Sequence, residues 1–239
     1  MKSKQLLTPF RAMLLLVLAC VVVWLVAHIM HTRAVEREYK YTATNGTVTI
    51  ILYTGTSGNL TFPDKINGLP VTDIGSAFTH CFLEIGGKQF WAAYILTNVT
   101  IPDSVTNIEP VAFSDCRNLT KVTMSRNVRH IGAEAFFNCR SLTSIVIPDG
   151  VTSIEENTFA GCTNLTNIRI PNGVTEIGME AFYHCRKLTK LDIPSSVTNI
   201  GYAAFGACDS LTNLIIPKSV ISNTNGLFAR PYETNALKL

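Results

Sequence analysis

Charged side chains are scarce in this sequence. Asp, Glu, Lys and Arg make up only 15% of its residues, and the formal net charge is +3. Residues 1–40 hold six of the 20 basic residues but only two of the 17 acidic ones, so the remainder carries 14 − 15 = −1. A nucleic-acid-binding surface needs clustered basic side chains that displace counterions from phosphates. We therefore expect no nucleic acid partner.

Sequence motifs of catalysis are also lacking. The chain has no glycine-rich phosphate loop, no HExxH, no GxSxG and no paired-carboxylate arrangement, and Glu155-Glu156 is typical of a solvated turn. His130 and His184 lie far apart in the sequence, and neither indicates a catalytic Cys/His pair. We expect a protein that is not an enzyme, with no catalytic residue, no cofactor and no metal.

A long apolar run distinguishes the beginning of the chain. Residues 12–30 read AMLLLVLACVVVWLVAHIM and follow a basic segment, residues 1–11. Such a run is long enough to span a hydrocarbon core of about 30 Å as a helix, and the preceding positive charges favour a cytoplasmic amino terminus. We predict a single-pass membrane anchor, a linker at residues 31–40, and the rest outside the cytoplasm. Two alternatives are a cleaved signal peptide with secretion, and a lipid anchor at Cys20 within VLAC.

A single repeating unit organises most of the remaining sequence. Five segments of equal length align without a gap, and they begin at Val105, Val128, Val151, Val174 and Val197. Each repeats a valine, an isoleucine, a phenylalanine, a cysteine and a leucine at fixed positions. The phenylalanines are Phe113, Phe136, Phe159, Phe182 and Phe205, and the cysteines are Cys116, Cys139, Cys162, Cys185 and Cys208.

The fixed period of 128 − 105 = 23 is typical of a leucine-rich-repeat solenoid, in which stacked neighbours bury a shared core. The Leu-Thr-x-Ile-x-Ile part of each repeat alternates like a strand, and a proline ends it. The IGxxAFxxC part suits a short helix or 3₁₀ segment. We predict an α/β fold in which each coil contributes one strand to a parallel sheet on the concave face and one short helix to the convex face.

The ends of the repeat array differ from its middle. Residues 41–70 contain turn signals such as Asn45-Gly46 and are predicted to form a β capping unit. Residues 71–219 contain six repeats, of which the first has an insertion at about 82–95, and residues 220–239 form a degenerate last repeat. The chain is expected to end inside a strand, whose free edge offers a route to a homo-oligomer.

Repeats such as VTSIEENTFAGCTNLTNIRIP and VTEIGMEAFYHCRKLTKLDIP resemble the BspA-type leucine-rich repeat of bacterial and some protist surface proteins. The resemblance covers about residues 41–239 and implies a solenoid. It further implies a surface-exposed module for adhesion or for binding host proteins. The family motif contains no catalytic residue, so the resemblance transfers none.

The cysteines could serve as metal ligands, nucleophiles, disulfide partners or buried apolar side chains. Six of the seven recur at one position of the repeat, so they should form a ladder with one thiol every ~4.8 Å. A straight ladder cannot converge on a zinc ion, and a nucleophilic thiolate needs an exposed, electropositive setting. Neighbouring rungs lie within the Cα range of a disulfide, but parallel Cβ atoms oppose closure. We expect buried, reduced thiols, with oxidised neighbours as the alternative.

Ligand binding is expected on the outward side of the predicted strands. The residues that flank the buried position of each strand there are Asn98, Thr100, Lys121, Thr123, Ser144, Val146, Asn167, Arg169, Lys190, Asp192, Asn213 and Ile215. Lys121, Arg169 and Lys190 offer anchors for carboxylates or sulfates. Alternatively, the strip is an ordinary solvated sheet face.

The insertion is a second candidate, because its aromatic residues Phe90, Trp91 and Tyr94 are suited to recognition. They suit a folded cap on the first coil equally well. Taken together, the sequence predicts a membrane-anchored recognition or adhesion module for a protein or glycan ligand. The alternative is a structural envelope protein that associates with itself or serves as a scaffold for other membrane proteins.

The phenylalanine column is predicted to fill the centre of the solenoid. Replacing one member, Phe159→Ala, is then expected to lower the free energy of unfolding by about 3–5 kcal/mol, as large core truncations do. Denaturant unfolding of the variant measures this change. An unchanged midpoint would count against burial.

Overall fold

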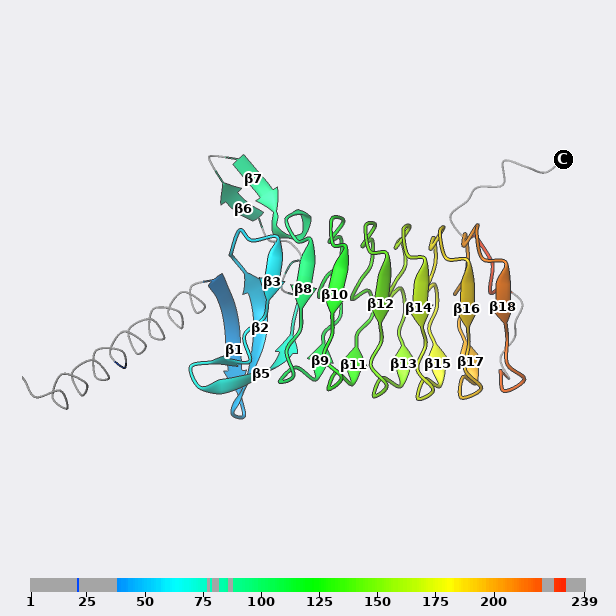
Figure 1. The fold of residues 1–239 in the computed structure, drawn as a ribbon, viewed down its shortest axis with the longest axis horizontal. Coiled ribbons are helices and arrows are strands. Elements are labelled where there is room, and N and C mark those ends of the chain that lie inside the picture. Colours follow the sequence, from blue (N-terminus) through cyan, green and yellow to red (C-terminus); the bar gives the residue numbers. More distant parts are fainter. Residues whose placement is uncertain are drawn as a thin grey trace, which may run out of the picture. The chain divides into compact units, whose positions relative to one another are not determined.

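The computed structural model describes residues 21, 38–76, 78, 82–85, 88–220 and 226–230. Residues Tyr39–Leu239 form one compact unit. Its described part is a stack of similar coils wound in one direction, with strands on two sides and turns between them (Figure 1).

The predicted membrane anchor at residues 12–30 lies outside the described residues except for Val21, and so do residues 1–11 and Cys20. Within the described residues, no helix combines the length and the apolar character that a membrane crossing requires.

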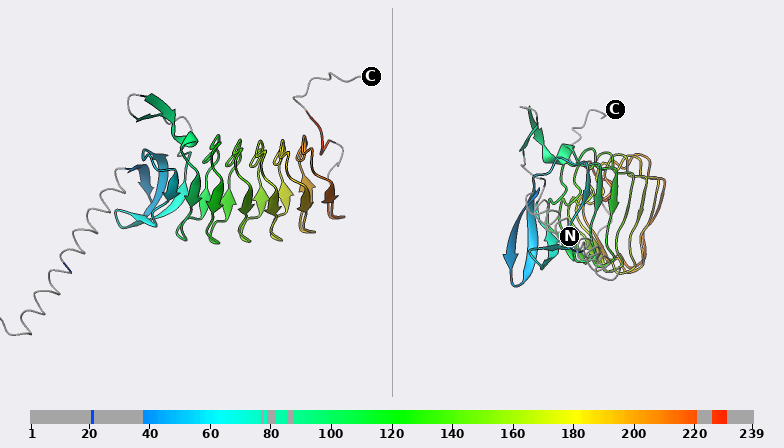
Figure 2. Two further views of the ribbon diagram at one scale, coloured as in Figure 1. Left: turned by 45° about the horizontal axis from the view of Figure 1, so that its top comes forward. Right: turned by 60° about the vertical axis from the view of Figure 1, so that its left-hand side comes forward.

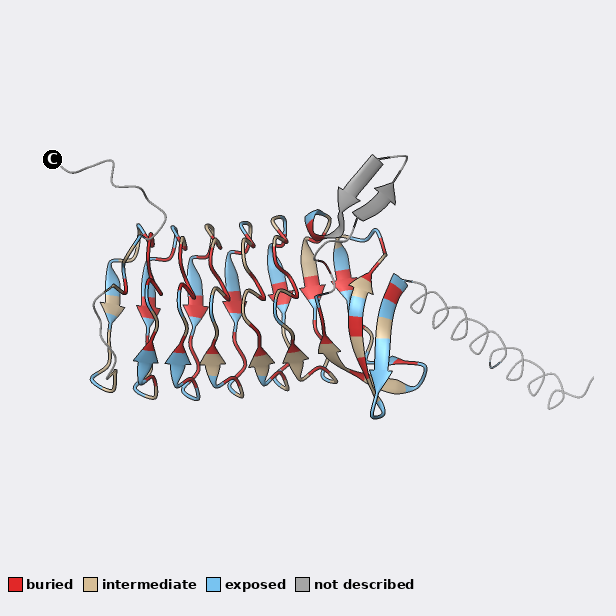
Figure 3. Cartoon of the chain, turned by 180° about the vertical axis from the view of Figure 1, so that it is seen from behind, coloured by how far each residue is buried: buried red, intermediate tan, exposed pale blue. Residues whose placement is uncertain are grey.

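One side of the solenoid, called here the long-strand face, carries three-residue strands. They are β3 (Asn59–Thr61), β8 (Asn98–Thr100), β10 (Lys121–Thr123), β12 (Ser144–Val146), β14 (Asn167–Arg169), β16 (Lys190–Asp192) and β18 (Asn213–Ile215). Paired neighbours run parallel, in the order β10-β8-β3, β12-β14 and β16-β18. The middle residue of each strand points inward while its neighbours point outward, as the pleat requires (Figure 3).

A second set of parallel strands, which belong to two sheets on the short-strand face, was not predicted. It includes β5 (Leu69–Ile74) and two-residue strands that each bury an isoleucine. These strands are β9 (Asn107–Ile108), β11 (His130–Ile131), β13 (Ser153–Ile154), β15 (Glu176–Ile177) and β17 (Asn199–Ile200). The registers pair residues one repeat apart, such as Glu176 with Asn199.

The phenylalanine column forms a stack along the axis of the solenoid. Phe78 and the five repeat phenylalanines are fully buried, with ring centroids 5.3–5.9 Å apart and planes within 22° of one another. A near-parallel stack at this spacing is favourable because the rings are displaced sideways rather than face to face. The predicted burial of this column is confirmed.

Strands near the amino end cover the first phenylalanine of the stack. The antiparallel pair β1 (Tyr39–Thr44) and β2 (Thr47–Tyr53) joins the short-strand face because β2 runs parallel to β5, and β4 (Lys65–Ile66) pairs antiparallel with β5. Tyr53 and Phe62 are buried, and their ring centroids lie 5.8 and 6.3 Å from that of Phe78. The end of the phenylalanine stack is therefore shielded from water.

The predicted α/β fold with one helix per coil is wrong, because the part of the chain that the structure describes is a β-solenoid with almost no helix. The IGxxAFxxC segments form successive tight turns on a third side, the turn face, comprising residues 109–117 and their equivalents in the following repeats. Successive backbone amides donate alternately to the next coil and to their own turn. The Phe113 N–H donates to Ala135 O in the next coil (2.8 Å), and the Ser114 N–H donates to Val111 O in the same turn (3.0 Å). A helix would return every amide to its own segment.

Left-handed residues cause this alternation. Two positions per coil have φ between 52° and 74°, a conformation that interrupts a right-handed helix. They are Val111, Glu134, Asn157, Glu180 and Ala203 at the first position, and Asp115, Asn138, Gly161, His184 and Ala207 at the second. The second position is rich in Asp, Asn, Gly and His, the residues that tolerate this region best.

Threonines before the long strands add hydrogen bonds between coils. The N–H and Oγ1 of Thr120 both donate to Thr97 O, at 2.8 and 2.9 Å, and Thr166 does the same to Thr143 O at 3.0 and 3.1 Å. The hydroxyl donates to the carbonyl of the preceding coil just outside the strand ladder, which is a structural reason for the repeated Leu-Thr pair.

The cysteines lie beneath the turn face. The five cysteines in the described residues are free thiols, and Cys139, Cys162, Cys185 and Cys208 each donate Sγ–H to a phenylalanine carbonyl of an earlier coil, at 3.0–3.3 Å. Their buried position, as small and largely apolar side chains, confirms the prediction for these residues. Cys81 lies outside the described residues.

The insertion forms a hairpin. β6 (Phe82–Ile85) and β7 (Lys88–Trp91) pair antiparallel, with Phe82 opposite Trp91, and the 3₁₀ helix η1 (Ala92–Tyr94) returns the chain to β8. Both views of Figure 2 show the hairpin projecting away from the stack of coils.

Val111 is a β-branched residue in a left-handed conformation, with φ 57°. Because asparagine tolerates this region better, Val111→Asn is expected to raise the free energy of unfolding by about 1 kcal/mol. The reciprocal change at the equivalent position, Asn157→Val, should lower it by a similar amount. Denaturant unfolding measures both. A lower free energy of unfolding for Val111→Asn, or a higher one for Asn157→Val, would contradict a strain at this position.

Burial raises the pKa of the Cys162 and Cys208 thiols to about 12, from an ordinary value of 9.0, and raises those of Cys116, Cys139 and Cys185 as well. Because these pKa values are higher in the folded state, the stability they contribute is complete below pH 9 and is lost as the pH rises towards 12. Each thiol should lower the free energy of unfolding by about 1.4 kcal/mol per pH unit in that window.

This loss is measured by denaturant unfolding under reducing conditions at several pH values above 9. Cys162→Ala should make the slope against pH shallower by the contribution of one thiol. A slope identical to that of the unsubstituted chain would show that Cys162 ionises equally in both states.

Candidate functional site

The outward residues of the long-strand face form a continuous strip. Lys121, Thr123, Ser144, Val146, Asn167, Arg169, Lys190, Asp192, Asn213 and Ile215 are all exposed, as is Thr100, while Asn98 is half-buried. The strands that carry them are adjacent, so equivalent residues of successive repeats lie side by side. The structure thus gathers all the residues of the predicted strip on one surface.

Opposite charges within or beside the strip meet in ion pairs. Arg169 Nη1 lies 2.9 Å from Asp149 Oδ1, and Lys190 Nζ lies 2.9 Å from Asp192 Oδ2. Such exposed pairs contribute little to stability, so a ligand carboxylate or sulfate can replace the acidic partner at small cost. Lys121 has no acidic partner among the described residues.

A hollow of about 420 Å³ interrupts the strip between β14 and β16, where the described strands are adjacent but not paired. Asn167, Arg169 and Asp192 line one part of it, and Asn172 and Pro194 line another. Two exposed apolar side chains flank this region on the neighbouring strands, Val146 on β12 (70% exposed) and Ile215 on β18 (77% exposed). Charged, amide and apolar groups therefore lie together around one depression.

The insertion is only partly described. Phe90 and Trp91 belong to β7, but their side chains lie outside the described residues. Tyr94 lies in η1 and turns towards the next coil: the Arg117 guanidinium lies 5.3 Å from its ring centroid, and Asn118 Nδ2 donates to Tyr94 O at 2.7 Å. These contacts hold Tyr94 against the next coil, while the residue stays 37% exposed.

The titratable groups offer little chemistry. In the described ranges, no group of three or more His, Cys, Asp and Glu residues is arranged to hold a metal ion. The high pKa of thiols such as Cys162 keeps them protonated at neutral pH, and a protonated thiol is a weak nucleophile.

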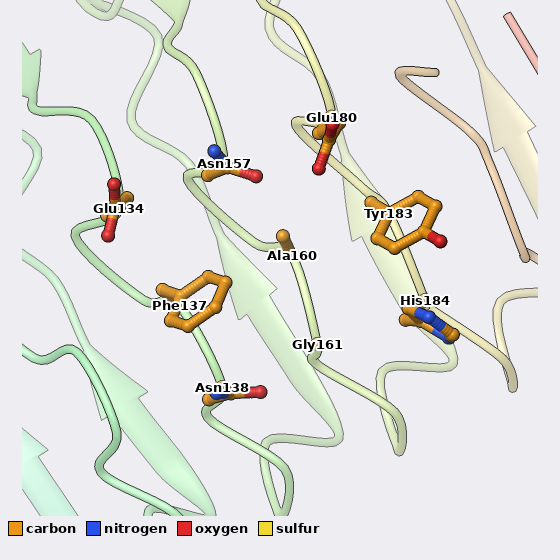
Figure 4. Close-up of a pocket in the computed structure, with 9 residues that line it drawn as sticks. All are labelled: Glu134, Phe137, Asn138, Asn157, Ala160, Gly161, Glu180, Tyr183 and His184. Carbon is orange, nitrogen blue, oxygen red and sulfur yellow. The ribbon is translucent and has the colours of Figure 1, made fainter. Parts of the chain in front are cut away.

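A second hollow, which sequence reasoning missed, lies on the turn face (Figure 4). It has a volume of about 370 Å³ and is lined by three consecutive coils. Its lining residues are Glu134, Phe137, Asn138, Asn157, Ala160, Gly161, Glu180, Tyr183 and His184. One signal was present in the sequence, because the position occupied by Phe137 and Tyr183 holds alanine in the coil between them, at Ala160.

The repeat region matches the model of a known protein family. The family model described as the BspA type leucine rich repeat region matches residues 83–212 and 130–238, with six copies. No curated protein matches the chain.

Solved structures resemble the fold. A leucine rich repeat protein of T. pallidum is 30% identical over 76% of this chain and 81% of its own, with a TM-score of 0.68. A leucine rich cell surface protein from Faecalibacterium prausnitzii is 32% identical, with a TM-score of 0.55; the match covers 73% of this chain and 52% of that one. A leucine-rich repeat protein from Bacteroides ovatus is 29% identical over 77% of this chain and 41% of its own, with a TM-score of 0.51.

Proposed function

Because the chain belongs to the BspA-type leucine-rich repeat family, we propose that it is a recognition or adhesion module that binds a protein or glycan through its long-strand face. The observation that carries the proposal is the strip itself. Its scaffold positions are buried and repeated, whereas its outward positions are exposed and differ from coil to coil. A surface that varies on a constant scaffold is suited to recognition.

The chemistry of the strip favours an acidic ligand. Lys121, Arg169 and Lys190 are exposed cations, and one arginine and two asparagines line the hollow between β14 and β16. Arginine binds carboxylates and sulfates with paired hydrogen bonds, and exposed Val146 offers an apolar contact nearby. A sulfated or uronic-acid glycan, or an acidic protein surface, matches this combination.

Membrane anchoring through residues 12–30 would hold this module at the cell surface, with the amino terminus in the cytoplasm. The apolar run and the preceding basic residues support it. One similar solved structure is itself described as a cell surface protein. Binding rather than catalysis is the role that the buried thiols and the exposed strip support.

Self-association, as a structural envelope protein, is the second candidate. One observation favours it: β18 is the last described strand of the long-strand face, pairs with β16 alone among the described strands, and carries exposed Ile215. A strand at the edge of a sheet pairs readily with another strand.

The test uses intact cells that express the full chain, with surfaces coated with heparin or with mucin as probes. The chain should increase adhesion to at least one of them. Joint replacement Lys121→Glu and Arg169→Glu should lower this adhesion about tenfold or more, because it reverses the charge of the strip. A matched double variant away from the strip, Arg126→Glu and Arg129→Glu, should retain it.

Protease treatment of the intact cells beforehand should abolish the adhesion. Equal loss in both double variants would contradict binding through the strip. Adhesion that survives complete proteolysis of surface proteins would contradict exposure of the solenoid. A cross-linked homo-oligomer without adhesion to either probe would favour the second candidate.

A further inference from the structure

The hollow on the turn face is separate from the strip, because its lining residues belong to the turns of each coil and not to the long strands. The coil at its centre contributes Asn157, Ala160 and Gly161, whereas the coils on either side place larger side chains at the positions of Ala160 and Gly161. The result is a slot that is one coil wide, with Ala160 and Gly161 as its floor (Figure 4).

Aromatic rings form the two walls of the slot. Tyr183 belongs to the buried apolar cluster that contains Ala160, and Phe137, which comes from a coil two steps away, packs against that cluster. Strand spacing places such coils about 10 Å apart. That separation leaves room for one saturated ring in van der Waals contact with both walls, since each contact needs about 4 Å.

Tyr183 is held in place from the far side. A Cβ atom at Gly206 would lie 2.7 Å from Tyr183 Cδ2, so the ring lies directly over that glycine. Ala203 and Ala207 belong to the same buried cluster as this ring. This wall is therefore preformed, and a ligand would not have to order it.

The two rims of the slot differ in polarity. One rim carries the carboxylates of Glu134 and Glu180 with the Asn157 amide between them (Figure 4), and Glu180 is only 6% exposed. Ionised carboxylates only accept hydrogen bonds. This rim therefore favours a ligand group that donates several hydrogen bonds and carries positive charge, and it opposes an anion.

The other rim carries Asn138 and His184. Arg186 Nε lies 3.4 Å from His184 Nδ1. Because a guanidinium can only donate, His184 Nδ1 is the acceptor in this contact. This rim thus carries an imidazole and an amide, two groups that form hydrogen bonds with hydroxyl groups.

We infer that the slot binds an amino sugar, with its protonated amine at the Glu134 carboxylate and its ring between Phe137 and Tyr183. The amine supplies three donors to the acidic rim, the C–H faces of the ring contact the aromatic walls, and hydroxyls reach Asn138 and His184. The cavity of about 370 Å³ lies within the range of small-molecule sites and is larger than an ammonium group alone would need.

The test is saturation-transfer NMR of the full chain in detergent micelles, with D-glucosamine as the probe. D-Glucose, which lacks the amine, and N-acetyl-D-glucosamine, in which the amine is neutral, should bind about tenfold more weakly, the value of one charge-assisted hydrogen bond. Ethanolamine, which has the ammonium without the ring, should also bind more weakly than glucosamine.

Variants separate the two recognition elements. Glu134→Gln should reduce the preference for glucosamine over glucose, whereas Phe137→Leu, which keeps an apolar side chain, should weaken both sugars. Glu176→Gln, an exposed carboxylate on the short-strand face, should change neither. The variants Lys121→Glu and Arg169→Glu should also leave glucosamine binding intact, which separates this site from the strip.

Absence of saturation transfer to glucosamine would overturn the inference. Equal transfer to glucose and glucosamine would overturn the role of the carboxylates, as would an undiminished preference in Glu134→Gln. If ethanolamine matched glucosamine, the slot would be a cation site without selectivity for a sugar, which would also overturn the inference.

Discussion

Hydrogen bonding between coils, in a register that stays constant from one repeat to the next, is the constraint on which the rest of this structure depends. It aligns the phenylalanines into a stack, places thiols such as that of Cys162 beneath the carbonyl of an earlier coil, and pairs parallel strands on both the long-strand face and the short-strand face. A single inserted residue would displace every side chain of a strand to the other face. The one large insertion, between Phe78 and η1, projects from its coil as a hairpin. The register between coils resumes at β8.

Much of the fold was accessible from the sequence, because buried positions repeat and their identity reflects packing. Phe159 and Cys162 recur with their equivalents in each repeat, and both are buried. The helix expected on the turn face was wrong for a local reason. Apolar spacing such as that of Ile131, Phe136 and Cys139 fits a helix and a chain of tight turns equally well, and the distinction depends on backbone angles at Glu134 and Asn138. Glutamate at a left-handed position gives little indication of its conformation.

Of the two candidate sites, one could be located from the sequence and the other could not. The strip could be located because alternation along a strand determines which residues face outward, as at Lys121 and Thr123. The slot could not be located in the same way. It arises where small and large residues alternate from coil to coil at one position, and the sequence does not show which way the neighbouring side chains point. Only the structure reveals that Tyr183 lies over Gly206 and that Ala160 is left as a floor between two aromatic rings.

The slot also bears on how such an array changes during evolution. Its floor comes from small side chains of one coil, whose backbone hydrogen bonds match those of its neighbours. Duplication, deletion or exchange of a whole repeat would therefore move, copy or erase the recess without disturbing the frame that supports it. A solenoid of this kind can acquire new binding specificities by recombination between its own repeats, a route closed to folds in which each binding residue comes from a structurally unique element.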